Sequence, residues 1–403
     1  MTQRHDVLIV GGGLVGASLA IALDAHGLDV GLVEATPGGE MPAVFDQRNL
    51  SFAAATVNAL EALGVMRKLG APTGPIRRIH VSRQGDFGRV VLEAADYGRE
   101  CFGQVVVARD FGAALEARLG ELKHLTRYRP ARFLGVCDGT GSDRRGVRVS
   151  WPTGEQVIEA RLLVGADGTH GAVREALGIG VREHDYAQTL FVARMRADKA
   201  PDGTAYERFT SEGPTALLPR GDRHFGVIHA VAAPAAAAVA ALDDSAWLAR
   251  IQDVFGWRVG RFTGTGERAA YPIVQRVAER ATGVRALLVG NAAQTIHPIG
   301  AQGFNLGLRD ALTLSELLAD AGDPGAPAVL EAYVERRRED RARTLEFSDG
   351  LARITSNTLP LLRPLRSLGM LAAASSPSMQ SMLVGGAMGF RGHVPALCRG
   401  TRS

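Results

Sequence analysis

The chain has 403 residues, of which 46% are hydrophobic and 22% charged, a composition typical of soluble globular proteins and long enough for two or three domains. Its net charge of +4 is spread along the sequence apart from one C-terminal concentration, which argues against a nucleic-acid-binding protein. Three cysteines without a CxxC pair argue against a disulfide framework or a zinc site, and with no signal peptide or membrane-spanning stretch we expect a cytoplasmic protein.

The chain begins with the pattern of a strand, a helix and a second strand. Residues 6–10 (DVLIV) form a continuous apolar run, as in a strand buried on both faces of a parallel sheet. Residues 14–26 carry apolar side chains at helical spacing, and residues 30–33 form a second buried strand that ends at Glu34. We therefore expect a strand–helix–strand unit of about 30 residues.

The turn between the first strand and the helix reads Gly11-x-Gly13-x-x-Gly16. The first glycine permits a tight turn, the second lets the backbone approach a pyrophosphate, and the third lets helix and strand pack closely. The N-terminus of the helix then faces the phosphates. Glu34, about 20 residues further on, can bind both ribose hydroxyls of an adenosine. The motif predicts a bound dinucleotide but does not by itself distinguish FAD from NAD.

Residues 76–92 and 190–231 have a different character. Apolar and polar residues alternate along them, for example in residues 191–196 (FVARMR), and this period of two is typical of antiparallel strands with one solvated face. The Ala-rich residues 232–242 favour a helix. We expect these segments to form a β-rich domain inserted into the first one.

Two later apolar runs repeat the pattern of the first strand. Residues 161–164 (RLLV) lead into the turn Gly165-Ala-Asp167-Gly168, which is followed by Arg174. Residues 285–289 (RALLV) lead into Gly290-Asn291, a glycine-rich turn and a helix from about residue 304 to residue 319. Taken alone, each turn could be an ordinary loop between a strand and a helix.

Together these turns resemble the fingerprints of flavoprotein hydroxylases of the para-hydroxybenzoate hydroxylase type. Residues 165–168 resemble the Asp-Gly fingerprint, and residues 290–305, which include HPIGAQGFN, resemble the third fingerprint. In that family the latter stretch runs beneath the ribityl chain and the isoalloxazine ring, so the resemblance implies FAD. A helix that begins near Phe304 would direct its positive dipole end toward the pyrimidine side of the flavin.

Two further matches extend the resemblance. Arg48 stands where the family has an arginine that reaches the phosphate region of the flavin, and Gln104 and Arg109 match the segment that enters the next helix. Either arginine could instead be an ordinary surface residue. The residues assigned to FAD are Gly11, Gly13, Gly16, Glu34, Arg48, Gln104, Arg109, Asp167, Gly168, Asn291, Gly300, Ala301, Gln302, Gly303, Phe304 and Asn305.

The resemblance covers nearly the whole chain and implies an α/β fold. We expect a Rossmann-like FAD-binding domain, an inserted β-rich substrate domain that covers the ring, and a helical C-terminal region. Their expected bounds are 1–70, 98–180 and 285–350 for the first, 71–97 and 181–284 for the second, and 351–403 for the third.

The subgroup resembled most is that of the ubiquinone-biosynthesis hydroxylases, of the 2-polyprenyl-6-methoxyphenol hydroxylase type. Residues 208–219, 290–298 and 303–310 carry this resemblance. There are two departures: Asn291 replaces the usual aspartate, and the order Gly300-Ala301 is closer to para-hydroxybenzoate hydroxylase. The substrate therefore stays open between a polyprenylated phenol and a small soluble aromatic compound.

The resemblance implies an FAD-dependent monooxygenase that hydroxylates an aromatic ring with O2 through a flavin hydroperoxide. Because the sequence has no second GxGxxG turn, NAD(P)H would bind only transiently as the electron donor. The flavin carries out the chemistry, so no side-chain nucleophile is expected. His297 and Pro298, next to the flavin loop, are the candidate catalytic residues, although His297 could equally be a loop histidine packed against Pro298.

Other functional classes are less well supported by the sequence. A flavin-dependent reductase is compatible with the same fold. A flavin-dependent halogenase would carry a Trp-x-Trp-x-x-Ile element, which is missing here. A non-catalytic dinucleotide sensor would not need the flavin loop of residues 290–305.

The C-terminal part of the chain combines basic and apolar residues. Arg336, Arg337, Arg338, Arg341 and Arg343 lie on one expected helix, and Arg353, Arg363 and Arg366 follow among leucines 359, 361, 362, 365, 368 and 371. This pattern suits attachment to the inner face of a membrane, where a polyprenylated substrate would reside, or to a ubiquinone-biosynthesis complex. A helix packed on the chain's own FAD domain fits equally well. Homo-oligomer formation stays open.

Overall fold

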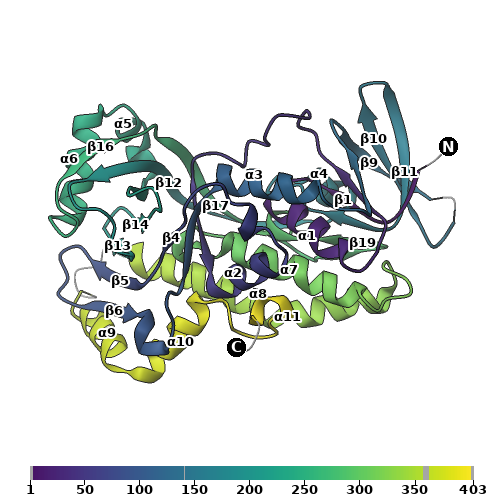
Figure 1. Ribbon diagram of the computed structural model, residues 1–403. Coiled ribbons are helices and arrows are strands. Elements are labelled where there is room, and N and C mark those ends of the chain that lie inside the picture. Colours follow the sequence, from purple (N-terminus) through teal and green to yellow (C-terminus); the bar gives the residue numbers. More distant parts are fainter. Residues whose placement is uncertain (1–2, 140, 357–362, 401–403) are drawn as a thin grey trace.

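The computed structural model describes residues 3–139, 141–356 and 363–400, with two large sheets at opposite ends of the molecule (Figure 1). In the first sheet, β1 (Gln3–Val10) lies between β2 (Val30–Val33) and β11 (Gly154–Gly165), and both pairs are parallel. β19 (Ala286–Leu288) and β8 (Leu125–Tyr128) extend the parallel part on either side. The expected sheet of first, middle and late apolar runs is therefore confirmed.

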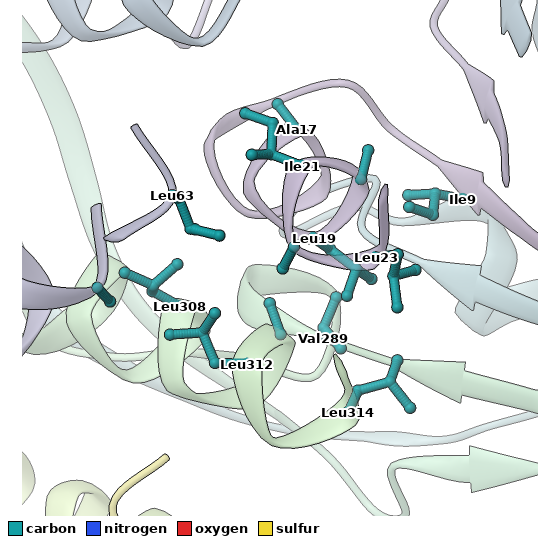
Figure 2. Packing of buried hydrophobic residues seen from close by; sticks show 14 of the residues in the cluster. Ile9, Ala17, Leu19, Ile21, Leu23, Leu63, Val289, Leu308, Leu312 and Leu314 are labelled. Atoms are coloured by element: carbon teal, nitrogen blue, oxygen red, sulfur yellow. The ribbon is translucent and has the colours of Figure 1, made fainter. Parts of the chain in front are cut away.

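The central strand β1 is buried on both faces. Val7 and Ile9 point into one hydrophobic cluster, whereas Leu8 and Val10 point into another, as the two-residue period of a strand requires. Figure 2 shows the first cluster, in which Ile9 and Val289 pack with leucines of two neighbouring helices. The helices that line this face are α1 (Leu14–Asp24), α3 (Ala108–Leu119) and α7 (Gln302–Leu318).

A β-hairpin that the sequence analysis did not single out covers the other face. β9 (Arg132–Asp138) pairs antiparallel with β10 (Arg145–Trp151), and β10 in turn pairs with β11. Val147 and Val149 of this hairpin are fully buried in the second cluster, beside α4 (Ala172–Ala176). β18 (Thr282–Gly283) adds a short antiparallel edge next to β19.

The second large sheet is almost wholly antiparallel, as the alternating segments predicted. Its one parallel pair joins β5 to β13, which brings residues 78–83 beside residues 204–209. The strands are β5 (Arg78–Arg83), β6 (Arg89–Glu93), β12 (Val181–Ala197), β13 (Thr204–Phe209), β14 (Pro214–Pro219), β15 (Phe225–Ala232), β16 (Phe262–Thr265), β17 (Ala269–Ala278) and β20 (Gln294–Thr295).

Helix α6 (Asp244–Phe255) covers the outer face of this sheet. Asp243 caps the helix by accepting a hydrogen bond from the Ala246 N–H, and Trp247 is fully buried against Phe191. The Ala-rich segment is helical, as expected, but in two short pieces: the 3₁₀ turn at Ala233–Ala235 and α5 (Ala236–Ala240).

A small sheet joins the two large ones. It consists of β3 (Asn49–Ala53), β7 (Gly103–Val107) and β4 (Gly74–Pro75), with β7 in the middle. β3 leads directly into α2 (Ala54–Ala62), and β7 leads directly into α3. Short 3₁₀ turns lie at Met66–Lys68, Ala94–Tyr97, Gly290–Ala292 and Ile299–Ala301.

The C-terminal helices pack back onto both sheets (Figure 1). α8 (Pro327–Ser356) is one continuous helix and contains the arginines that the sequence analysis placed on one helix. α9 (Arg363–Ser375) lies against β6, and α10 (Pro377–Ala387) follows it. α11 (Ala396–Arg399) packs on α2, where the Asn58 side chain donates a hydrogen bond to the Cys398 carbonyl at 3.0 Å. Among the described helices, none combines the length and apolarity needed to cross a bilayer.

The five arginines lie on one helix, as expected, but they differ in their surroundings. Arg337 is buried between Asp310 and Asp340, and Arg341 donates to the backbone carbonyls of Ala278 and Ala293. The other three, Arg336, Arg338 and Arg343, are exposed and pair with glutamates. Leu359, Leu361 and Leu362 lie outside the described residues, as do the side chains of Arg353, Arg363, Leu365 and Arg366.

Candidate active site

The three glycines of the turn after β1 have two different roles. A Cβ atom at Gly11, which has φ +105°, would lie 2.5 Å from the Ala166 carbonyl oxygen, and one at Gly16 would lie 1.9 Å from the Gly11 oxygen. These two positions therefore permit only glycine, because strand and helix touch there. A Cβ at Gly13 would meet only Val44, at 3.6 Å, so the space in front of Gly13 is open to a ligand.

The carboxylate of Glu34 closes the far side of this turn. Its Oε2 accepts a hydrogen bond from the Gly12 N–H at 2.8 Å, and its Oε1 accepts one from the Thr36 N–H at 2.7 Å. The acid is thus fixed at the end of β2 beside the turn, where an adenosine ribose can reach it.

Asp167 and Gly168 follow β11 on the opposite side of β1. The Asp167 Oδ2 accepts a hydrogen bond from the Val173 N–H at 2.9 Å, whereas its Oδ1 is buried and has no hydrogen-bond partner in the described part of the chain. Burial raises the pKa of this carboxyl, and the Val173 bond opposes that rise. A buried carboxylate oxygen without a partner is costly, and a hydroxyl of a bound cofactor would satisfy it. Gly168, with φ +83°, has open space beside it.

The loop before α7 leads into a second helix N-terminus, in addition to that of α1. Gly300 and Ala301 both have positive φ, 69° and 52°, and α7 begins at Gln302, two residues before the predicted start. Helix N-termini normally carry a capping side chain, but neither Ala301 of α7 nor Gly13 of α1 supplies one. Their free N–H groups and positive dipole ends suit an anionic ligand. A Cβ at Gly303 would meet no atom within 4 Å.

Other residues of this loop are held by protein contacts. Asn305 uses its whole amide: Oδ1 accepts from the Ala53 N–H and the Thr56 hydroxyl, and Nδ2 donates to the carbonyls of Ser51 and Ala301. Phe304 packs against Phe52 and Phe111, with ring centroids 5.3 Å apart in each pair. Gln302 is buried and donates to the Gly300 carbonyl, while Asn291 is exposed.

Arg48, Gln104 and Arg109 lie along the segments that connect the two sheets. The Arg48 guanidinium pairs with Asp46 at 2.7 Å and lies 4.7 Å from the centroid of the Tyr271 ring. The Arg109 N–H donates to the Asp46 carbonyl, which holds the Arg48 loop against α3, and the Arg109 side chain is exposed. The Gln104 side chain accepts a hydrogen bond from the Thr73 hydroxyl at 2.7 Å.

His297 is fully buried next to this loop. Its Nδ1 accepts the Ile299 N–H at 3.1 Å, its Nε2 lies 3.4 Å from the Gln188 amide oxygen, and its ring stacks edge-on with Tyr186. Burial lowers the pKa of His297 to about 4, with the carboxylate of Asp349 opposing the shift, so the ring is neutral at pH 7. His297 had two interpretations, a catalytic residue and a packed loop histidine, and this geometry favours the second. Pro298, its neighbour, lines the cavity described next.

Residues 298–302 of this loop line a cavity of about 360 Å³. Its size is that of a site for a small organic molecule. The inner face of the β-rich sheet forms one wall, and α8 forms another with Thr344, Phe347 and Leu351. Met370 of α9 and Leu383 of α10 line its far part.

The cavity also holds charged residues that the sequence analysis did not assign to the site. Glu207 of β13 lies on the sheet wall, and Arg309, Asp340, Arg343 and Arg391 line the part near α8 and the C-terminal segment. Because every second residue of a strand lies on the same face, the position of Glu207 between Ala205 and Phe209 could have been predicted once residues 204–209 were identified as a strand. Nothing in the sequence pattern pairs Arg309 with Asp340, which lie 31 positions apart and form a buried ion pair at 2.7 Å.

These features fit FAD. Gly13, Glu34 and Asp167 follow the carboxyl ends of the parallel strands β1, β2 and β11. The site offers two uncapped helix N-termini, open space at Gly13 and Gly303, a fixed carboxylate at Glu34, and an Asp167 oxygen that has no partner among the described residues. An open α/β sheet binds its ligand at this edge. The apolar cavity is lined at one place by residues 298–302 of the loop before α7.

Comparisons with known proteins agree with this geometry. Residues 4–348 match a family described as the FAD binding domain. The chain is 34% identical over 389 residues to ubiquinone hydroxylase UbiL of Rhodospirillum rubrum, covering 95% of this chain and 89% of that protein. It is 31% identical to the 3-demethoxyubiquinol 3-hydroxylase of Escherichia coli, covering 92% and 95%.

The fold is also found in solved structures. The crystal structure of p-nitrophenol 4-monooxygenase from Pseudomonas putida superposes with a TM-score of 0.78 at 18% identity, covering 97% of this chain and all of that one. At that identity the likeness concerns the fold, and it supports the arrangement of a Rossmann-like sheet, an antiparallel sheet and C-terminal helices.

Proposed function

This chain belongs to the FAD binding domain family of aromatic-ring monooxygenases, and from that premise we propose that it hydroxylates the ring of a polyprenylated phenol in ubiquinone biosynthesis. The single observation that carries the proposal is the apolar cavity that starts at the flavin loop and runs on past α8 to α9 and α10. A ring held at the loop would leave its hydrocarbon chain along that path. The names of the relatives with 34% and 31% identity point to the same substrate class.

Different parts of the chain are proposed to bind the cofactor and the substrate. We propose that residues 1–70, 98–180 and 285–350 bind FAD, through the glycine-rich turn, Glu34, Arg48, Gln104, Arg109, Asp167–Gly168, Asn291 and residues 300–305, and that residues 71–97 and 181–284 enclose the substrate. Bound FAD supplies the reduced flavin with which O2 reacts. The chain positions the ring, and its cavity walls keep water away from the reacting atoms. NAD(P)H is the proposed electron donor, bound transiently.

The apolar wall of the cavity consists of residues that cannot donate or accept hydrogen bonds through their side chains. Ile79, Val81, Leu92 and Leu218 are examples from three strands. Burying the hydrocarbon chain of a substrate against such residues is favourable by about 25 cal/mol per Å² of apolar surface. A polyprenyl chain therefore adds affinity that a small aromatic compound cannot gain.

Quinone profiling of a strain that lacks the gene tests the proposal. We expect the strain to accumulate a polyprenylated phenol that is missing one ring hydroxyl, and to regain its normal quinone when the wild-type gene is restored. A gene encoding the Gly13→Val variant serves as the flavin-deficient control and should not restore it. An unchanged quinone content in the deletion strain would remove the pathway assignment.

One observation favours a second candidate, a hydroxylase of a small soluble aromatic compound. The order Gly300-Ala301 in the flavin loop is the one found in para-hydroxybenzoate hydroxylase rather than in the ubiquinone subgroup. The two candidates differ in where the protein should be found. The ubiquinone pathway predicts attachment to the inner face of the membrane or to a biosynthetic complex, and cell fractionation with detection of the protein distinguishes that from a freely diffusing enzyme.

A further inference from the structure

One carboxyl group interrupts the apolar wall of the cavity. Along β13, Ala205, Glu207 and Phe209 face the cavity, together with Val81 and Ala216, the residues directly opposite Glu207 on the neighbouring strands. The alternate residues make contacts elsewhere: the Tyr206 ring packs with Phe255, although Tyr206 also borders the cavity, and Arg208 donates to the Ser82 hydroxyl. Strand geometry therefore fixes the side chain of Glu207 toward the cavity.

The surroundings of Glu207 offer it no protein partner. Within the described residues, no hydrogen bond or ion pair involves this carboxyl, and it is the only carboxyl on the sheet wall of the cavity. Its flanking residues on that wall, Ala205, Phe209, Val81 and Ala216, are apolar. An apolar wall would be more stable without a charge, so an unpaired carboxyl there needs a reason in the ligand.

The other charged groups of the cavity lie on different elements. Arg309 of α7 and Asp340 of α8 are paired with each other at 2.7 Å, Arg343 of α8 pairs with Glu339, and Arg391 belongs to the segment after α10. Tyr206 is the other titratable group that contributes to the wall near Glu207. Burial alone raises the pKa of Glu207 to about 7, so none of these charges offsets the effect.

We propose that Glu207 is a substrate-binding catalytic residue, which accepts a hydrogen bond from a ring hydroxyl of the aromatic substrate and takes up that proton as the ring is hydroxylated. In this step the O–H bond of the phenol breaks and an O–H bond to the Glu207 carboxylate forms. The electron pair stays on the phenol oxygen, which makes the ring richer in electrons at the carbon that is attacked. The proton leaves to water when product departs.

The chemistry of a carboxyl near its pKa suits both halves of this role. As a carboxylate it accepts a charge-assisted hydrogen bond, which is stronger than a bond between neutral groups. A general base works best when its pKa lies near the pH at which the enzyme operates. Glu207 would also discriminate, because a methyl ether in place of the ring hydroxyl has no proton to donate and would leave the carboxylate unpaired.

The inference rests on the proposed function only in requiring a ring with a hydroxyl group, and its test needs no polyprenyl chain. The probes are 4-methoxyphenol and its methyl ether, 1,4-dimethoxybenzene, titrated into oxidised FAD-loaded enzyme between pH 5.5 and pH 8.5. Binding is measured by calorimetry and by the change in flavin absorbance. The variants are Glu207→Gln and Glu207→Ala, and Glu267→Gln is the matched control, since Glu267 is exposed and lies outside the cavity.

In the wild type and in Glu267→Gln, 4-methoxyphenol should bind about fivefold more tightly above the pKa of Glu207 than below it, because the ionised acceptor gains about 1 kcal/mol over the neutral one. The dimethyl ether should show the opposite trend, since only the protonated acid can donate to it. In Glu207→Gln both trends should vanish, and in Glu207→Ala the preference for the phenol should fall at every pH. The rise of kcat/KM with pH near 7 should be lost in both variants.

Three results would overturn the assignment: the same pH dependence in Glu207→Gln as in the wild type, parallel trends for the two probes, or binding of neither probe. The outcome is separate from that of quinone profiling. If the pH trends were lost in Glu207→Gln while the deletion strain kept its normal quinone, the results would support the role of Glu207 and reject the ubiquinone substrate. If the pH trends persisted in Glu207→Gln while the deletion strain showed altered quinone, the results would reject the role of Glu207 and support the ubiquinone substrate.

Discussion

The two ends of the active site are built in different ways. The proposed cofactor end consists mainly of backbone: Gly11, Gly13 and Gly16 shape one turn, and residues 300–303 shape another before α7. The substrate end consists of side chains from strands and helices that are distant in the sequence, such as Glu207 on β13 and Phe347 on α8. Backbone constraints depend on residues close together in the sequence and so produce a short motif, whereas a wall of side chains produces none.

The largest expected effect separates the roles of two glycines at the cofactor end. Gly13→Val should yield a folded protein without FAD, because the Cβ of the new side chain meets only Val44 among the described residues and the side chain enters the space proposed for the pyrophosphate. Gly16→Val should instead prevent folding or lower the yield, since a Cβ there collides with the Gly11 carbonyl.

Flavin absorbance of the purified protein and its circular dichroism measure the two effects. Gly38→Ala is the control, because Gly38 has no neighbour within 4 Å and no positive φ. Stoichiometric FAD in Gly13→Val would show that the open space is not the phosphate site.

The second prediction concerns the helix that forms one wall of the substrate end. Arg337 of α8 is 2% exposed and pairs with Asp310 of α7 and with Asp340, each at 2.7 Å. Arg337→Met should lower the free energy of unfolding by about 3–5 kcal/mol, because it leaves two buried carboxylates without their shared partner.

Arg338→Met, at the next position, provides the matched control. Arg338 is exposed, and among the described residues it pairs with Glu335 alone, so this change should cost less than about 1 kcal/mol. Urea denaturation measures both variants. Equal effects at the two positions would mean that the buried pairs do not hold α8 in place.

The smallest effect concerns stability rather than function. Since burial raises the pKa of Glu207 from 4.5 to about 7, the folded protein holds this proton more tightly than the unfolded chain does. The free energy of unfolding therefore falls as pH rises from about 4.5 to about 7 and then stays level. Glu207→Gln removes this loss and should be more stable than the wild type by about 2 kcal/mol at pH 8, with little difference at pH 4.

Thermal denaturation at the two pH values checks this sign. Glu267→Gln should follow the wild type at both. A Glu207→Gln variant that is less stable than the wild type at pH 8 would show that the carboxylate has a protein partner after all.

Much of the fold could be predicted because local patterns carried it. The buried run at 6–10, the alternating residues at 191–196 and the helix before residue 319 each appear where expected. The hairpin β9–β10 did not stand out, since β9 has a single fully buried residue and lacks a continuous apolar run. The pattern of α8 predicts a helix that carries five arginines, but it does not predict that Arg337 is buried against α7 while Arg338 is exposed.

The sequence by itself determined the cofactor end of this protein. The Gly-x-Gly-x-x-Gly turn, the glutamate after the next strand and the Asp-Gly pair each form a short local pattern, so the motifs for FAD stand out in the sequence. The tertiary structure alone decided the substrate end. It placed Glu207 in the cavity and joined Arg309 to Asp340, because strand pairing and helix packing bring together residues that no sequence spacing connects.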